Sequence, residues 1–237
     1  MGPDPDYFDD PTWSREALWV SDERLPDAGR HWLQAFGSRT GTGLYPLLLD
    51  TLDGEPGRPW HGGELSPAPK GTIDVLSGNG VLRRLWDDAA AEEDGPWPGL
   101  AAAGEGEDGS DADEVARELV ESLARERDWL LGLVPATRGA DALTLAGWDG
   151  PCNHTNHTQE ISAVLRSWED RFGVRVVAVG FATLQVSVAR PPVTFEHACQ
   201  VAAEHFAFSP DNWLDHGTLE EYAETIVKAD RWSFWWD

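Results

Sequence analysis

Residues 158–189 read TQEISAVLRSWEDRFGVRVVAVGFATLQVSVA, and this stretch decides the fold. In its first half, apolar side chains recur at helical spacing over residues 161–172, Thr158 is a typical cap, and Gly173 is a typical helix end. Its second half is rich in β-branched residues and predicts a β-hairpin that turns near residues 181–183. A strong helix followed by a hairpin indicates a fold that combines helices with a sheet.

Elements of the same two kinds surround this stretch in the C-terminal half. We expect a strand over 130–135, a short helix over 138–147, a helix capped by Thr194, a helix opened by the capping box of Thr218 and Glu221, and a final strand over 231–237. The order from Leu130 is therefore β-α-α-β-β-α-α-β. This order predicts an α/β (α+β) fold in which helices pack on a mixed sheet, with a smaller α/β portion on the N-terminal side.

The sequence before Leu130 predicts further elements and a division into parts. We expect a helix from about Asp27, a buried strand over 44–49, a helix capped by Asp74 that continues to Trp86, and a helix from Asp113 to about Trp129. The expected parts are an acidic flexible tail over 1–14, an N-terminal α/β portion over 15–92, an acidic, Gly-rich connector over 93–111, and a C-terminal domain over 112–237.

The charge of the chain limits the classes of partner. The 237 residues include 42 acidic and 18 basic side chains, which give a formal net charge of −24. Residues 86–116 hold eleven of the acids and no base, so much of the imbalance lies around the connector. Because nucleic acids and anionic membranes attract Lys and Arg, this charge disfavours both as partners. It favours a basic protein partner only if the connector or the N-terminal tail takes part in binding, and a connector that mimics nucleic acid is a less favoured variant of that idea.

The expected compartment is the cytoplasm of a bacterial cell. The N-terminus has neither the basic nor the apolar segment of a signal peptide, and no apolar run approaches the ~18 residues that span a bilayer. Two cysteines, Cys152 and Cys199, are too few for a disulfide framework. The 13 Trp and the hydrophobic fraction of 41% indicate a chain that can bury a core. The oligomeric state stays open.

No nucleophile elbow, phosphate-binding loop or zinc-protease motif occurs in the chain. The densest polar cluster covers residues 152–158 and ends at Thr158, the expected cap of the next helix. Its C-x-H-x-x-H spacing could suit zinc, with Cys152, His154 and His157 as ligands, but a loop that begins the helix is favoured. We therefore expect no metal and no cofactor. The cluster supplies three candidate binding residues: Asn153, His154 and His157.

Two other patterns bear on chemistry. Cys199 and His205 lie on one face of an expected helix and could form a nucleophile and its base, but Cys199 shares an apolar stripe, which favours simple packing. Adjacent tryptophans near the C-terminus face opposite sides of a strand, so one is expected in the core and the other more exposed, where Trp often anchors an interface. The remaining binding candidates are Asp211, Asn212, Trp213, Trp235 and Trp236.

Three blocks of the C-terminal half, residues 163–177, 202–212 and 232–237, resemble in the same order a family catalogued as domain of unknown function 4253. The resemblance covers about residues 130–237, and shorter upstream segments around Trp19, Tyr45 and Trp60 resemble the N-terminal portions of longer members. The family is common in actinomycetes, so the resemblance implies a cytosolic bacterial protein. It implies no catalytic residue, because no activity is attached to the family.

Two classes of function follow from these observations. The favoured one is a non-enzymatic protein-binding module, such as an immunity or antitoxin-like inhibitor, whose acidic surface is drawn to a basic partner and anchored by aromatic residues. The alternative is a hydrolase-type enzyme, with or without a metal, whose cleft uses His154, His157, Asp211 or His205.

Overall fold

The computed structural model describes residues 17–90, 95–105, 111–213 and 216–237. The expected acidic tail over 1–14 lies outside these ranges. Of the expected connector over 93–111, residues 95–105 and 111 are described, and residues 95–105 run along the outside of the C-terminal half.

The described strands form one mixed sheet, which confirms the α/β fold. They are β1 (Trp19–Val20), β2 (Leu44–Leu49), β3 (Leu130–Pro135), β4 (Val174–Val179), β5 (Thr183–Val188) and β6 (Arg231–Trp235), in the spatial order β1-β3-β2-β4-β5-β6. Only β2 and β4 pair in parallel, and the other neighbours are antiparallel. The chain order from Leu130 is β-α-α-β-β-α-α-β, as expected.

Strand β2 joins the N-terminal portion to the C-terminal one. It pairs with β3 along its whole length and with β4 only at Leu48 and Leu49. Pro46 therefore lies where β2 has a single neighbouring strand, which is where a sheet tolerates proline. Tyr45 and Leu47–Leu49 are all buried, because both faces of this central strand are covered.

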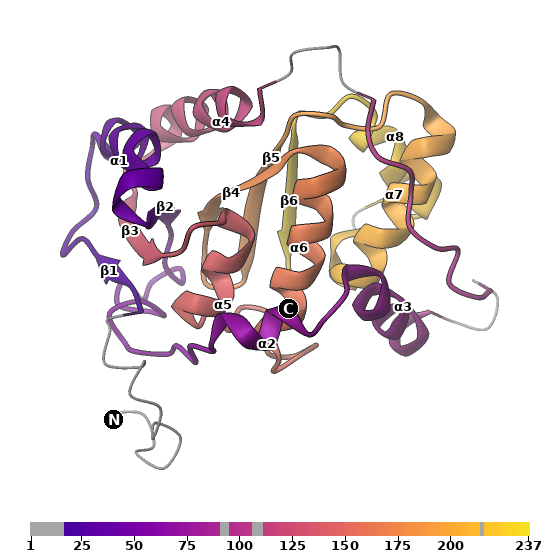
Figure 1. Ribbon diagram of the computed structural model, residues 1–237, viewed down its shortest axis with the longest axis horizontal. Helices are drawn as coiled ribbons and strands as arrows, with labels where there is room; N and C mark the ends of the chain where they lie inside the picture. Colours follow the sequence, from indigo (N-terminus) through magenta and orange to yellow (C-terminus); the bar gives the residue numbers. More distant parts are fainter. Residues whose placement is uncertain (1–16, 91–94, 106–110, 214–215) are drawn as a thin grey trace.

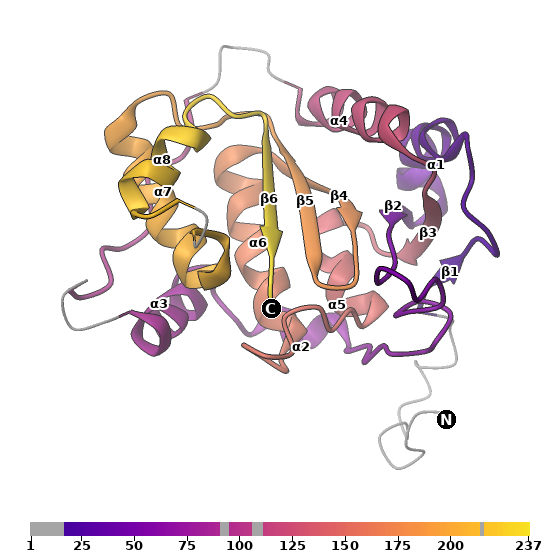
Figure 2. The same cartoon turned by 180° about the vertical axis from the view of Figure 1, so that it is seen from behind.

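Helices pack on the sheet and at both of its ends. They are α1 (Ala28–Thr42), α2 (Lys70–Asp74), α3 (Gly78–Ala89), α4 (Ala112–Glu126), α5 (Ala142–Ala146), α6 (Thr158–Phe172), α7 (Phe195–Phe208) and α8 (Leu219–Ile226). Figure 1 shows α6 in front of the strands, α1 and α4 beside β1 to β3, and α7 and α8 at the opposite end. Seen from behind in Figure 2, the strands β4 to β6 lie in front of α6.

The core is centred on Trp168 of α6, which is fully buried. Its ring stacks on Phe234 of β6 at 5.3 Å and meets Phe208 of α7 edge-on at 4.8 Å, both measured between centroids. Such aromatic contacts stabilise beyond the area they bury. Strand β6 therefore faces α6 and α7 with its buried residues and leaves Arg231 and Ser233 exposed.

Most of the predicted helix ends are confirmed. Gly147 and Gly173 end α5 and α6 with φ of 77° and 65°, the left-handed conformation that glycine adopts without strain. The side chains of Thr194 and Thr218 accept hydrogen bonds from the first turns of α7 and α8.

Three predicted boundaries were wrong. Asp74 ends α2 instead of capping the next helix, and Ser77 caps α3 by accepting a hydrogen bond from the Gly80 N–H. Thr158 is the first residue of α6, and its hydroxyl donates to the Trp148 carbonyl at 2.9 Å. The helix α4 is capped by Asp111, begins at Ala112, and ends at Glu126 instead of near Trp129. The errors at α3 and α6 are choices between neighbouring capping residues, and the error at α4 is a helix end three residues early; local sequence decides neither.

Within the described residues, no helix is both long enough and apolar enough to cross a membrane.

Candidate functional site

A cleft of about 1100 Å³ opens between the C-terminal end of α3, the loop before α6 and the α7–α8 region. One wall is apolar, and its larger side chains are Leu85, Trp86, Ile161, Phe206, Phe208, Leu219 and Trp236. The polar side chains of the lining are Asp88, Asn153, His154, Thr155, Asp211, Thr218 and Glu220. An aromatic wall with a few converging polar groups is the usual composition of a binding site.

The polar side of the cleft is built around Asp211, which follows α7 in the short 3-10 helix Pro210–Trp213. Its Oδ2 lies 2.8 Å from Nε2 of His154 and accepts a hydrogen bond from the Asp237 N–H at 3.0 Å. Asn153 Nδ2 donates to the main-chain oxygen of Asp237 at 2.7 Å. The structure therefore brings together three chain segments that are far apart in sequence.

Trp236 forms part of the apolar wall. Its ring meets Trp148 at 5.5 Å and Phe208 at 5.4 Å, both edge-on, and only 3% of the residue is exposed. Its Nε1 donates to the Phe208 carbonyl at 3.3 Å. Trp235 next to it is partly exposed and lines a separate cavity of about 300 Å³. The expected division of these two tryptophans between the core and the surface is thus confirmed.

The sequence-predicted candidates divide between the cleft and other places. Asn153, His154, Asp211 and Trp236 line the cleft. Asn212 instead donates to the Tyr222 hydroxyl at 3.0 Å and lines the smaller cavity with Trp235. His157 precedes α6, with its Nδ1 3.4 Å from Gln159 Nε2, and Trp213 ends the 3-10 helix.

The cleft also contains residues that the sequence did not single out. Trp86 and Phe206 meet edge-on at 5.5 Å and come from the apolar stripes of α3 and α7. A stripe at helical spacing predicts a buried face, and nothing in the spacing separates its solvent-facing end from the rest. Asp88 and Glu220 are exposed acids near the ends of two helices, and only the tertiary structure places them at one opening.

The charge of the cleft is negative. Its described lining includes three carboxylates, those of Asp88, Asp211 and Glu220, and no Lys or Arg. Asp88 is paired with Arg84 at 2.7 Å on the exposed side of α3. Glu220 takes part in no ion pair among the described side chains. A concave surface of one sign concentrates ligands of the opposite sign, so the cleft favours cations.

The three residues of the less favoured zinc site, Cys152, His154 and His157, are not arranged as zinc ligands. His154 is bonded to Asp211, His157 lies against Gln159, and Cys152 is exposed. Over the described ranges, no three side chains of His, Cys, Asp or Glu gather as a metal site requires.

Cys199 and His205 behave as packing residues. The His205 ring is fully buried against Trp168 and Trp232, and burial, together with the nearby charge of Arg171, lowers its pKa from 6.5 to about 3. Burial and the charges of Glu220 and Glu196 raise the pKa of the Cys199 thiol, so it stays protonated near neutral pH. A protonated thiol is a poor nucleophile, which favours the packing interpretation.

Residues 130–237 match the family described as Domain of unknown function (DUF4253). Comparison with curated proteins and with solved structures gives no match. His154, Asp211, Glu220 and Trp236 lie inside the matched range, whereas the wall contributed by α3 lies before it. The cleft is therefore shared between this domain and the N-terminal portion.

Proposed function

We propose that this protein, whose residues 130–237 belong to the family described as Domain of unknown function (DUF4253), is a non-enzymatic binding protein that takes a basic segment of a partner protein in its cleft. An inhibitor of immunity or antitoxin type, directed at a basic enzyme, is the kind of protein that such a cleft suits. The proposal rests on the chemistry of the site, because the family description assigns no activity.

One observation carries this proposal: the described cleft lining combines an aromatic wall with three carboxylates and lacks Lys and Arg. An arginine or lysine side chain gains from both features, because its cation is attracted to carboxylates and to the faces of aromatic rings. The net charge of −24 adds long-range attraction that speeds the encounter with a basic protein.

The partner can be sought by affinity capture with the full chain from the cells that produce it. Glu220→Gln removes one cleft carboxylate without changing the shape of the side chain. Glu224→Gln is its matched control, because Glu224 is also exposed on α8 and lies outside the cleft lining. We expect a basic protein on wild type and on the control, bound about tenfold more weakly by Glu220→Gln.

The affinity of the captured protein should also fall as salt rises, because charge attraction is screened. Equal affinity of wild type, Glu220→Gln and Glu224→Gln would show that the cleft is not the binding surface. Capture of an acidic protein with no salt dependence would contradict the proposal as a whole.

The pair of His154 and Asp211 favours a second candidate, a hydrolase. A carboxylate at 2.8 Å orients an imidazole as in acid–base catalysis, and the pair lies in the cleft. The cleft hydroxyls are engaged: Thr155 donates to Glu160, and Thr218 caps α8. A water molecule would therefore act as nucleophile. Turnover of ester or phosphate substrates that disappears in His154→Gln would favour this candidate over the binding protein.

A further inference from the structure

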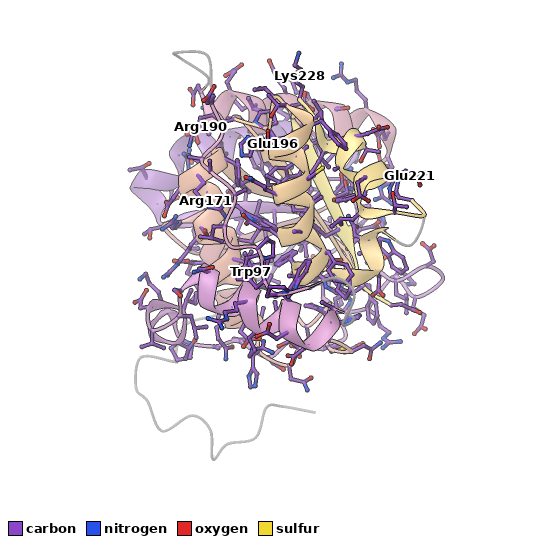
Figure 3. All side chains as sticks on the ribbon, turned by 90° about the vertical axis from the view of Figure 1, so that its right-hand side faces the viewer. Trp97, Arg171, Arg190, Glu196, Glu221 and Lys228 are labelled. Atoms are coloured by element: carbon purple, nitrogen blue, oxygen red, sulfur yellow. The ribbon has the colours of Figure 1, made fainter. Side chains whose placement is uncertain are left out.

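Residues 95–105, called the strap here, lie along α6 and α7, where main-chain atoms of residues 101–104 hold them. Nearer α3 the strap is also held by the Trp97 side chain, which donates to Asn79 Oδ1 at 3.1 Å and packs on Trp86. The Ala101 N–H donates to Glu204 Oε1 at 2.7 Å, and the Ala101 carbonyl accepts from Arg171 Nη1 at 3.0 Å. The Gly104 N–H donates to the Arg171 carbonyl at 3.1 Å. In Figure 3, Trp97 lies beside α3, and Arg171 and then Arg190 lie at increasing distance from α3.

The receiving site is a buried polar cluster. Glu204 of α7 is fully buried, and both of its oxygens accept hydrogen bonds from Arg171 of α6, at 2.8 and 2.6 Å. Trp168 Nε1 donates to Glu204 Oε2 at 2.7 Å. A buried carboxylate is costly unless its lone pairs are satisfied, and the strap N–H supplies the fourth bond. The hydrogen bonding of the Arg171–Glu204 pair is therefore completed by the backbone of the strap.

The strap contributes little besides its backbone at this point. Ala101 is buried, and a Cβ on Gly104 would lie 1.8 Å from the Arg190 carbonyl oxygen, so no side chain fits there. His197 Nε2 donates to the Ala102 carbonyl at 2.9 Å. This receiving groove, formed by Arg171, His197 and Glu204, binds the main chain of the strap and admits only Ala and Gly at positions 101 and 104.

The groove and its occupant come from different parts of the chain. Arg171, His197 and Glu204 lie inside residues 130–237, which the family covers, whereas the strap lies outside that range. We infer that this groove is a peptide-binding site of the domain, specific for a segment with Ala at the buried position and Gly at the partly buried position three residues later. In this chain the site is filled by the strap, which an equivalent outside peptide can replace.

Peptide binding to full-length variants tests the inference. The variant Ala101→Pro removes the N–H that Glu204 accepts and leaves the groove residues unchanged. The probe is a fluorescent peptide with the sequence of residues 95–105, followed by anisotropy. Wild type should bind it at least tenfold more weakly than the variant, because an attached strap competes at an effective concentration of the order of millimolar. Ala103→Val, at an exposed position without hydrogen bonds of its own, should behave as wild type.

Two controls separate groove binding from other contacts. The same peptide carrying Val in place of Gly104 should not bind to the Ala101→Pro variant. The indole N–H resonance of Trp168 should shift in that variant and return towards its wild-type position when the unmodified peptide binds. A folded Ala101→Pro chain that binds neither peptide, or binds both equally, would overturn the inference.

If Ala101→Pro does not fold, Gly104→Ala is the milder variant, and hydrogen exchange on wild type is a test without substitution. The Ala101 and Gly104 amides should exchange by local detachment, at least tenfold faster than amides of β4. Exchange at the rate of the β4 amides would mean that the strap leaves only when the whole protein unfolds. That result would also overturn the inference.

Discussion

The Nδ1 atom of His205 lies 2.8 Å from the hydroxyl oxygen of Tyr222, and both side chains are buried between α7 and α8. Asn212 Nδ2 donates to the same oxygen at 3.0 Å, so the hydroxyl proton is directed to Nδ1. The neutral imidazole then carries its own proton on Nε2, which has no hydrogen-bond partner among the described residues. A second proton would place a charge in an aromatic interior.

His205 should therefore make stability depend on pH. Burial lowers its pKa from 6.5 to about 3, so between these values the unfolded chain takes up a proton that the folded chain does not. The free energy of unfolding consequently falls as the pH drops below 6.5. From pH 7 to pH 5 this group should remove about 2 kcal/mol. The measurement is urea unfolding at both pH values, followed by Trp fluorescence.

Two variants isolate this effect. His205→Gln should lose less stability between pH 7 and pH 5 than wild type does, by about 2 kcal/mol. Tyr222→Phe keeps the buried imidazole, so it should retain the pH dependence while losing about 1 kcal/mol at every pH. An identical pH dependence in wild type and His205→Gln would show that His205 is not the group responsible.

A second prediction concerns the buried ion pair of Arg171 and Glu204. Glu204→Gln removes the charge that balances Arg171 and places an amide donor among donors, so it should cost about 3 to 5 kcal/mol of stability. Glu196→Gln, at an exposed position on the same helix, should change stability by less than about 0.5 kcal/mol. Chemical denaturation of the two variants gives the comparison, and equal effects would mean that burial of the pair contributes little.

A third prediction tests the contact of α3 with α6. A Cβ at Gly78 would lie 2.7 Å from Ser167 Cβ and 3.0 Å from the Ala163 carbonyl oxygen, so Gly78→Ala must push the helices apart. We expect a loss of about 1 to 3 kcal/mol. Gly37→Ala in α1 has open space around the new methyl group and should stabilise the protein by up to about 1 kcal/mol. Thermal unfolding of both variants should give shifts of opposite sign.

Local sequence predicted the elements better than their arrangement. The helical spacing over residues 161–172 and the β-branched run after Gly173 are signals within one element, and both elements are confirmed. Because β2 lies between β3 and β4, Leu48 pairs with Ala178, which lies 130 residues later in the sequence. Such pairing is decided by the packing of the whole sheet, and no local pattern encodes it.

For the candidate site, too, the sequence indicated the residues but not how they are arranged. His154 and Asp211 were both candidates because of their side chains, but their contact spans 57 residues of sequence and only the fold reveals it. Nothing in the sequence indicated that Glu204 is buried, since an acid next to His205 on a helix usually faces solvent. Its burial depends on Arg171 and Ala101, which belong to two other parts of the chain.

The last prediction compares Trp235, the last residue of β6, with Trp236, which follows it. Trp236 is 3% exposed and packs against Trp148 and Phe208, so Trp236→Ala should leave a cavity in the apolar wall of the cleft and cost about 3 to 5 kcal/mol. Trp235 is partly exposed, and its carbonyl, which accepts from Ser209 Oγ at 2.7 Å, survives substitution of the side chain. Trp235→Ala should therefore cost about 1 kcal/mol. Urea unfolding followed by circular dichroism measures both without relying on the altered fluorophores. Equal costs would contradict the assignment of Trp236 to the core, and a larger cost for Trp235→Ala would reverse the two faces of the strand.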